Sequence, residues 1–293
     1  MTNPAALARA WISLEGLAVG DALGEALLGA PPGDAPLRLP PRPRPWPWTD
    51  DTAMAISIVE VLAARGDIDP DDLAVRFASR YQAEPWRGYG GGAHAILAAI
   101  AAGTPWREAS GRAFDGQGSH GNGAAMRAAP IGAYFAGDPA RAAGAARASA
   151  APTHAHPEGA AGAIAIAVLA AAVFAGERDR ARLLEVTRAH TPSGEVARGL
   201  GELAALLDAD PLTVAATVGN GARVSAADTV PFAVWCALRH LDSLAAAVDA
   251  CVDVGGDVDT TAAMAAGIVV GAVGLDGIPM AWRAGREALP PRP

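Results

Sequence analysis

The stretch that decides the fold is GLAVGDALG, residues 16–24, which lies inside a largely apolar run over residues 8–29. Glycines recur in it every fourth residue, at Gly16, Gly20 and Gly24. A helix places residues four apart on one face, and glycine on that face leaves room for a second backbone to come close. The stretch therefore predicts a long helix packed tightly against another part of the chain.

Segments rich in alanine and other apolar residues follow at short intervals along the rest of the chain. They predict further helices over residues 53–64, 70–80, 93–102, 139–150, 158–175, 179–189, 194–207, 212–217, 230–240, 244–252 and 261–273. Runs that alternate β-branched and polar residues, the pattern of strands, are almost absent. We therefore expect an all-α fold with one domain over residues 1–293. The proline-rich residues 31–47 predict an extended surface connection, with a lid or a ligand for proline-binding modules as alternatives.

The composition narrows the class of protein. Hydrophobic residues make up 51% of the chain, enough for a large core, and the net charge of −8 argues against broad binding of nucleic acid. Cys236 and Cys251 are the only cysteines, so we expect neither a disulfide framework nor a zinc site, and a reducing cytoplasm fits. Residues 159–176 carry no charge and could cross a membrane by length. Their alanine and glycine content favours a buried helix instead.

Two acidic segments point to metal chemistry: WTDDT, residues 48–52, and GGDVDTT, residues 255–261. Together they offer four carboxylates and several hydroxyls, an all-oxygen ligand set that suits Mg²⁺, Mn²⁺ or Ca²⁺. The alternative is that each segment only caps the helix after it, with Thr49 or Asp50 as the first cap. If the fold brings the segments together, they predict a hydrolytic centre with one or two divalent ions.

A glycine-rich segment, GQGSHGNGAAMR over residues 116–127, adds a second polar element. Its backbone N–H groups could cradle a phosphate, although a flexible surface loop has the same composition. The segment THAHP, residues 153–157, carries two histidines, for which ligand contact is a better interpretation than metal binding. These segments are weak indicators when each is taken alone.

In combination, seven short motifs resemble the ADP-ribosylglycohydrolase family. They occur in the family's order and are GLAVGDALG (16–24), WTDDT (48–52), RGYG (87–90), GNGAAMR (121–127), TH (153–154), DTVP (228–231) and GGDVDT (255–260). The resemblance implies an all-α, single compact orthogonal helical bundle with two Mg²⁺ or Mn²⁺ ions in a central cleft.

The resemblance also implies a role for particular residues. The metal ligands would be Thr49, Asp50, Asp51, Asp257, Asp259 and Thr260, from the two acidic segments. The diphosphate and distal ribose would be held by Gly118, Ser119, His120, Gly121, Asn122 and Gly123. His154 would lie beside the ligand, and Tyr89 would line the cleft.

One position departs from the family pattern. Many members carry a glutamate near the metals eight residues after the glycine that matches Gly20, where this chain has Leu28. The nearest carboxylate is Glu25, three residues earlier. This departure puts the acid or base of the reaction in question.

The resulting hypothesis is a Mg²⁺-dependent hydrolase that cleaves the C1″ glycosidic bond of ADP-ribose, with Asp50 and Asp257 orienting or deprotonating the attacking water. The leaving group stays open among arginine, a hydroxyl such as serine, an acetyl ester and a nucleobase. The partner would be an ADP-ribosylated protein or a small-molecule conjugate, with no membrane and no broad nucleic-acid binding, and a monomer is favoured. The alternatives are a non-catalytic ADP-ribose-binding or structural protein and a metal-dependent nucleotide phosphoester hydrolase.

Overall fold

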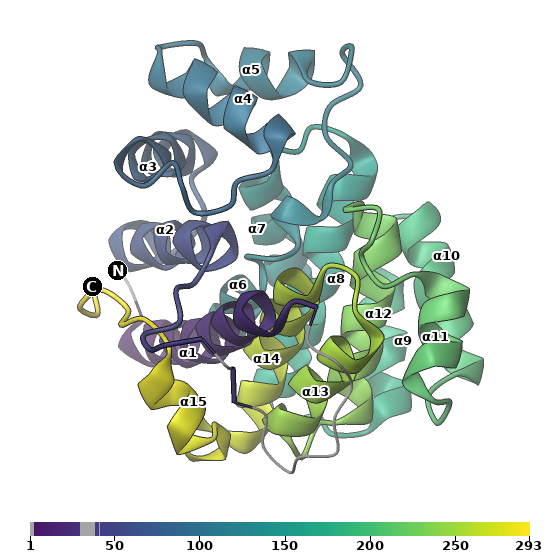
Figure 1. The fold of residues 1–293 in the computed structure, drawn as a ribbon. Helices are drawn as coiled ribbons and strands as arrows, with labels where there is room; N and C mark the ends of the chain where they lie inside the picture. The colour runs from purple at the N-terminus through teal and green to yellow at the C-terminus, as the bar shows by residue number, and fades with distance from the viewer. Residues whose placement is uncertain (1–2, 30–38, 41) are drawn as a thin grey trace.

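Helices make up the regular structure of the computed structural model, which describes residues 3–29, 39–40 and 42–293 (Figure 1). In order they are α1 (Pro4–Leu27), α2 (Asp50–Arg65), α3 (Pro70–Ala83), α4 (Gly91–Ala101), α5 (Trp106–Arg112), α6 (Ala129–Tyr134), α7 (Pro139–Ala150), α8 (Pro157–Phe174), α9 (Arg180–His190), α10 (Glu195–Glu202), α11 (Pro211–Val218), α12 (Ala226–Arg239), α13 (Leu244–Val254), α14 (Val258–Val273) and α15 (Met280–Gly285). The described residues contain isolated bridges but no named strand. The all-α prediction is confirmed.

The three glycines spaced four apart on α1 pack against α14. A Cβ added at Gly16 would lie 2.6 Å from the carbonyl oxygen of Ala266, and Cβ atoms at Gly20 and Gly24 would collide with the backbones of Ala262 and Asp259. The prediction that a second backbone approaches this face is confirmed. The contact also fixes the start of α14, which carries the second acidic segment, against the C-terminal end of α1.

The long apolar helix α8 lies inside the molecule. Its mean hydropathy of 1.8 and its 18 residues would suit a membrane span, but 72% of it is buried. Helices α6, α7, α9, α12 and α14 pack around it. The expectation of a buried helix in this segment is therefore confirmed by the described structure.

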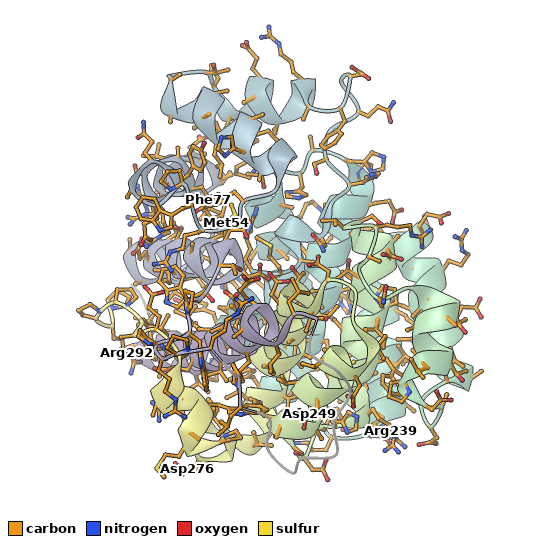
Figure 2. The ribbon with its side chains drawn as sticks, in the orientation of Figure 1. Met54, Phe77, Arg239, Asp249, Asp276 and Arg292 are labelled. Atoms are coloured by element: carbon orange, nitrogen blue, oxygen red, sulfur yellow. The ribbon has the colours of Figure 1, made fainter. Side chains whose placement is uncertain are left out.

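Helix α2 packs against α1, and α3 and α4 follow in order on its far side (Figure 1). Between α2 and α3, the buried side chains of Met54 and Phe77 lie close together (Figure 2). They enclose the guanidinium of Arg127, which lies 4.5 Å from the centre of the Phe77 ring and 3.4 Å from the Met54 sulfur. This packing joins α2 and α3 to the segment that follows the glycine-rich loop.

Several helices and helix boundaries differ from those predicted from the sequence. The short helices α5, α6 and α15 were not expected, and α12 begins at Ala226 instead of Val230. The hydroxyl of Ser225 accepts a hydrogen bond from the Asp228 N–H and caps α12, so Pro231 falls inside the helix rather than near its start. Of the proline-rich segment 31–47, residues 31–38 and 41 lie outside the described residues, and the remainder contains no helix.

Candidate functional site

A central cavity of about 340 Å³ receives side chains from both acidic segments. Of the residues singled out in the sequence, it is lined by Asp50, Asp51, Ser119, His120, Gly121, Asn122, Gly123, His154, Asp257, Asp259 and Thr260. The structure thus brings together segments that lie about two hundred residues apart. The glycine-rich loop and both pairs of carboxylates face one space.

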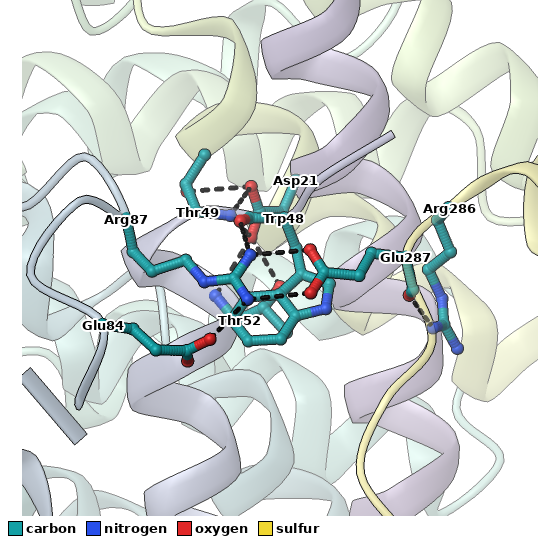
Figure 3. A network of polar contacts seen from close by, with 8 residues as sticks. All are labelled: Asp21, Trp48, Thr49, Thr52, Glu84, Arg87, Arg286 and Glu287. Atoms are coloured by element: carbon teal, nitrogen blue, oxygen red, sulfur yellow. Dashed lines mark hydrogen bonds and ion pairs between the residues drawn. The ribbon is translucent and has the colours of Figure 1, made fainter. Parts of the chain in front are cut away.

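The first acidic segment is organised by Asp21, a residue to which the sequence analysis assigned no role. Its buried carboxylate accepts hydrogen bonds from the N–H and hydroxyl of Thr49, at 3.0 and 2.8 Å, and from those of Thr52, at 3.1 and 2.5 Å (Figure 3). Thr49 occupies the N-cap position of α2 but makes no side-chain cap of its own. The expected cap by Thr49 or Asp50 is therefore supplied instead by Asp21 from α1.

The two carboxylates of the first acidic segment belong to a regular helix. Asp50 and Asp51 are the first two residues of α2, and both line the central cavity. Two neighbouring helical residues point about 100° apart, so the two side chains leave the helix in different directions. Both residues contribute to the lining of the central cavity from this first turn of α2.

The second acidic segment begins with two glycines in the left-handed region, Gly255 at φ 72° and Gly256 at φ 84°. A Cβ on Gly256 would collide with Asn220, so the backbone follows a path here that glycine permits and a side chain would block. Asp257 occupies the N-cap position of α14 without a side-chain cap hydrogen bond, and Asp259 lies in the first turn of that helix. The two carboxylates therefore flank a helix N-terminus, where negative charge is favoured.

Asn122 positions Asp257. Its amide nitrogen donates a hydrogen bond to the Asp257 carboxylate at 2.6 Å and another to the Thr229 hydroxyl at 3.1 Å. The resemblance assigned Asn122 to substrate contact, but both hydrogens of its amide point to protein groups in this structure. Its side chain links the glycine-rich loop to the second acidic segment.

Buried negative charge accumulates in the central cavity. Burial, with Asp21 and Asp257 nearby, raises the pKa of Asp50 to about 7. Burial and the neighbouring Asp257 raise the pKa of Asp259 to about 8. The pKa of Asp51 is also raised well above its usual value, first by burial and then by the other carboxylates. Because like charges disfavour ionisation, these groups need positive charge to be ionised together at neutral pH.

The donor set fits a hard divalent cation. Every candidate ligand in the two acidic segments is an oxygen atom, and the buried Oδ1 of Asp51 has no hydrogen-bond partner within the described structure. Among the described residues, no group of three or more His, Cys, Asp or Glu side chains is already arranged to hold a metal ion. The carboxylates of both segments nevertheless line one common cavity.

His154 lies beneath the glycine-rich loop. A Cβ added at Gly123 would lie 3.1 Å from its Nε2 atom. Arg127 donates to the Thr153 hydroxyl at 2.9 Å, and that hydroxyl lies 2.8 Å from Nδ1 of His154. The Thr153 proton is thus free to point at Nδ1, and this network assigns the imidazole proton to Nε2. Burial, with Arg127 and His120 nearby, lowers the pKa of His154 to about 3, which keeps the ring neutral.

Nothing in the sequence indicated that two apolar residues lie on the rim of the central cavity. Phe114 and Val224 both line it, with 55% and 56% of their surface exposed. Both adopt positive φ angles, 53° and 55°, which a residue with a side chain rarely does. No local pattern marks either residue, because the exposed position depends on loop geometry.

Three of the singled-out residues do not line the central cavity. Tyr89 packs edge-on against Tyr81, with ring centres 5.2 Å apart, and its buried hydroxyl has no partner within the described residues. Gly118 lies against the backbone of His156. Thr49 lines an adjoining cavity of about 540 Å³, the outer cavity, which is also lined by Glu25 and Asp259.

The departure from the family pattern is visible at the end of α1. Leu28 caps that helix and is 53% exposed. Glu25 lies one turn earlier, in the wall of the outer cavity. A carboxylate therefore adjoins the acidic segments from α1, although it comes from residue 25 and not from residue 28.

Comparisons with known proteins agree with these observations. A model of the family described as ADP-ribosylglycohydrolase matches residues 2–291. The chain is 33% identical over 274 residues to "ADP-ribosylhydrolase ARH3" of Bos taurus, covering 80% of this chain and 73% of that protein. The protein of the same name from Homo sapiens is 33% identical over 272 residues, with the same two coverages.

A solved structure shares the fold. The "ADP-ribosylglycohydrolase-related protein complex" aligns with a TM-score of 0.68 over 97% of this chain and 94% of that chain. The two sequences are 24% identical, so this similarity concerns the arrangement of helices alone.

Proposed function

The chain belongs to the ADP-ribosylglycohydrolase family, and from this premise we propose that it hydrolyses the C1″ glycosidic bond between ADP-ribose and an acceptor, with divalent cations as cofactors. One observation carries the proposal. Four carboxylates from two distant segments line the same cavity as a glycine-rich loop. The loop suits a diphosphate, and the carboxylates suit both cations and a sugar that develops positive charge.

The cations would be held by the two acidic segments. The candidate ligands are Thr49, Asp50, Asp51, Asp257, Asp259 and Thr260. Two observations support this assignment: burial and neighbouring carboxylates raise the pKa values of Asp50 and Asp259, and the buried Oδ1 of Asp51 has no hydrogen-bond partner within the described residues. If these residues hold Mg²⁺ or Mn²⁺, the ions would supply positive charge and would make a water molecule acidic enough to act as a nucleophile at neutral pH.

The side chains of this protein would divide the remaining work. Asp50 and Asp257 would orient the attacking water and accept its proton. The neutral His154, with its proton on Nε2 beneath the loop, would donate a hydrogen bond toward a ligand phosphate. Phe114 and Val224 offer exposed apolar surface at the rim, which suits the adenine base.

The proposal is tested by replacing one carboxylate of each segment. The double variant Asp50→Asn with Asp257→Asn should release ADP-ribose from a conjugate at least about 100-fold more slowly, the usual contribution of a positioned base. Circular dichroism should show that the helices remain. Undiminished release in this variant, or in the unchanged protein with excess chelator, would exclude the proposed mechanism.

One feature favours a second candidate, a non-catalytic protein that binds ADP-ribose. Leu28 places an exposed apolar side chain where many family members carry glutamate. Calorimetry with ADP-ribose, run beside a release assay, separates the candidates, since tight binding with no release would favour the binder. The family assignment favours glycosidic cleavage over the alternative of phosphoester hydrolysis.

A further inference from the structure

The peptide group between Trp48 and Thr49 lies directly before the candidate metal ligands of α2 and is held at both of its polar atoms. The Thr49 N–H donates to the Asp21 carboxylate at 3.0 Å, and the Trp48 carbonyl oxygen accepts a hydrogen bond from Nη1 of Arg87, also at 3.0 Å (Figure 3). Asp21 belongs to α1, whereas Arg87 lies between α3 and α4. Because a peptide group is planar and rigid, these two bonds fix its orientation and hence the direction in which α2 begins.

Arg87 and its neighbour Gly88 lie against the first acidic segment. The Arg87 guanidinium lies 3.5 Å from the centre of the Trp48 ring. A Cβ added at Gly88 would lie 3.8 Å from Oδ1 of Asp50 and 3.8 Å from Cβ of Thr49, which is van der Waals contact. A displacement of Arg87 would therefore be transmitted to two of the candidate ligands.

The position of Arg87 depends on Glu287. The Glu287 carboxylate accepts two hydrogen bonds from Arg87, one from each terminal nitrogen, at 2.6 and 2.8 Å. Such a charged pair with two bonds is strong and directional. Glu84 accepts a further bond at 2.7 Å, but it lies only three residues before Arg87. Glu287 is thus the carboxylate that ties Arg87 to a distant part of the chain.

The backbone of Glu287 is itself attached to the chain just before the first acidic segment. The Glu287 N–H donates to the carbonyl oxygen of Trp46 at 2.7 Å, and the Trp46 N–H donates to the carbonyl oxygen of Gly285 at 2.8 Å. These bonds hold the segment after α15 beside the residues that lead into Trp48. Glu287 therefore has a fixed backbone from which its side chain holds Arg87.

We propose that Glu287 is a positioning residue for the candidate metal ligands: through Arg87 it holds the peptide group before Thr49, and it thereby raises the affinity of the first acidic segment for a divalent cation. The inference rests on the cation binding in the proposed function and extends it to a residue outside both acidic segments. Glu287 acts through Arg87 and is not itself a ligand. Removing a partner that holds a metal ligand in place commonly lowers metal affinity about 10–100-fold.

Calorimetric titration with Mn²⁺ measures this effect without turnover. Glu287→Gln keeps the shape of the side chain and removes its charge, so we expect Kd for Mn²⁺ to rise about tenfold. The Mg²⁺ concentration that gives half-maximal release of ADP-ribose should rise by the same factor. At saturating Mg²⁺, kcat should fall less than about twofold, because the variant weakens binding rather than the chemical step. Glu287→Asp, which keeps the charge on a shorter side chain, should recover part of the affinity.

The matched control is Glu60→Gln on α2. Glu60 is 30% exposed and pairs with Arg76 and Arg80, and Glu287 is 31% exposed, so both substitutions neutralise a partly buried carboxylate held by arginine. Both variants should keep the helical circular dichroism spectrum, but only Glu287→Gln should weaken Mn²⁺ binding. A lower Tm with an unchanged Kd in Glu287→Gln, or an equal change of Kd in both variants, would overturn the inference.

A double-mutant cycle tests whether Glu287 acts through Arg87. Arg87→Lys keeps a positive charge but loses the planar arrangement of donors that meets both Glu287 and the Trp48 carbonyl oxygen. Combining it with Glu287→Gln should raise Kd no more than about twofold beyond the more severe single substitution, since residues in one network are not additive. Single effects that multiply in full would mean that Glu287 acts by a separate route, which contradicts the inference.

These measurements separate failure of the inference from failure of the proposed function. If the unchanged protein binds Mn²⁺ but releases no ADP-ribose, the proposed hydrolysis fails, and the Kd of Glu287→Gln still decides the inference. If Glu287→Gln releases ADP-ribose with the Mg²⁺ dependence of the unchanged protein, only the inference fails. If the unchanged protein binds neither cation, the proposed cation site and the inference fail together.

Discussion

Asp21 is the residue on which the geometry of the first acidic segment depends. It was part of a motif recognised in the sequence, but its partners Thr49 and Thr52 lie 28 and 31 residues away on another helix. No spacing along the chain reveals such a contact. By contrast, the carboxylates of the two acidic segments could be identified from the sequence as candidate metal ligands, because acidic clusters without His or Cys have a recognisable ligand chemistry.

Replacing Asp21 with asparagine should therefore destabilise the protein by about 2–4 kcal/mol, because backbone and hydroxyl donors of two threonines lose a charged acceptor in a buried place. Denaturation with urea measures the change. The matched control is Asp179→Asn, which weakens an exposed N-cap of α9 with two backbone bonds and should cost about 1 kcal/mol or less. Equal effects of the two substitutions would contradict the role given to Asp21.

His154 predicts a pH dependence with a defined sign. Its pKa is about 3 in the folded protein against an ordinary 6.5, so only the unfolded chain takes up its proton between these values. The stability from the neutral ring is complete above pH 6.5 and is lost as the pH falls toward 3. Between pH 6.5 and 5 this amounts to about 1.4 kcal/mol per pH unit.

The variant His154→Gln isolates this contribution. Urea denaturation at pH 7, 6 and 5 should show that the variant lacks the loss of stability in the unchanged protein, so the difference between them shrinks as the pH falls. The carboxylates with raised pKa values act in the opposite sense in both proteins and cancel in the comparison. Parallel pH profiles would show that His154 is not buried as a neutral ring.

At the scale of helices, the pairing of α1 with α14 is where sequence and structure agree best. The four-residue glycine period predicted both a helix and a close neighbour, and the structure supplies α14 as that neighbour. The short helices α5, α6 and α15 have 6 or 7 residues each. That length covers less than two turns, which is too short for an apolar period to be recognised.

Gly20→Ala tests the helix pair. The added methyl group would collide with the Ala262 backbone, so we expect a loss of stability of about 1–3 kcal/mol from overpacking, measured by thermal and urea unfolding. The control is Gly144→Ala in α7, where a Cβ meets nothing within 4 Å. That substitution should stabilise the protein by up to about 1 kcal/mol, because alanine has the higher helix propensity. A stable Gly20→Ala protein would contradict the close contact.

At the scale of the whole molecule, the site forms only when distant segments converge. The sequence could nominate both acidic segments and the loop, but their common cavity requires the helices to be placed. The outer cavity was not foreseen at all, because its wall joins Arg87 to Glu287 across 200 residues. Neither residue belongs to a pattern that indicates a second cavity.

Cation binding should couple to pH through the whole carboxylate cluster. The raised pKa values of Asp50, about 7, and Asp259, about 8, mean that the cation-free folded protein holds protons that the unfolded chain releases above pH 4. These groups therefore lower stability as the pH rises toward 8. Mg²⁺ competes with those protons, so saturating Mg²⁺ should raise Tm more at pH 8 than at pH 6.

Differential scanning calorimetry with Mg²⁺, with Mn²⁺ and with chelator measures this coupling. The variant carrying Asp50→Asn and Asp257→Asn should lose most of the Tm increase. An absence of any Tm change with either cation, or an equal change at both pH values, would argue against cation binding by this cluster.

The contact between Gly24 and the backbone of Asp259 has a consequence for which substitutions this protein can accept during evolution. Gly24 contacts Asp259, whose carboxylate lines the central cavity. We therefore expect one substitution at Gly24 to change both the stability of the protein and its turnover. Stability and catalysis therefore depend on the same position. Selection for stability at this position would also act on turnover.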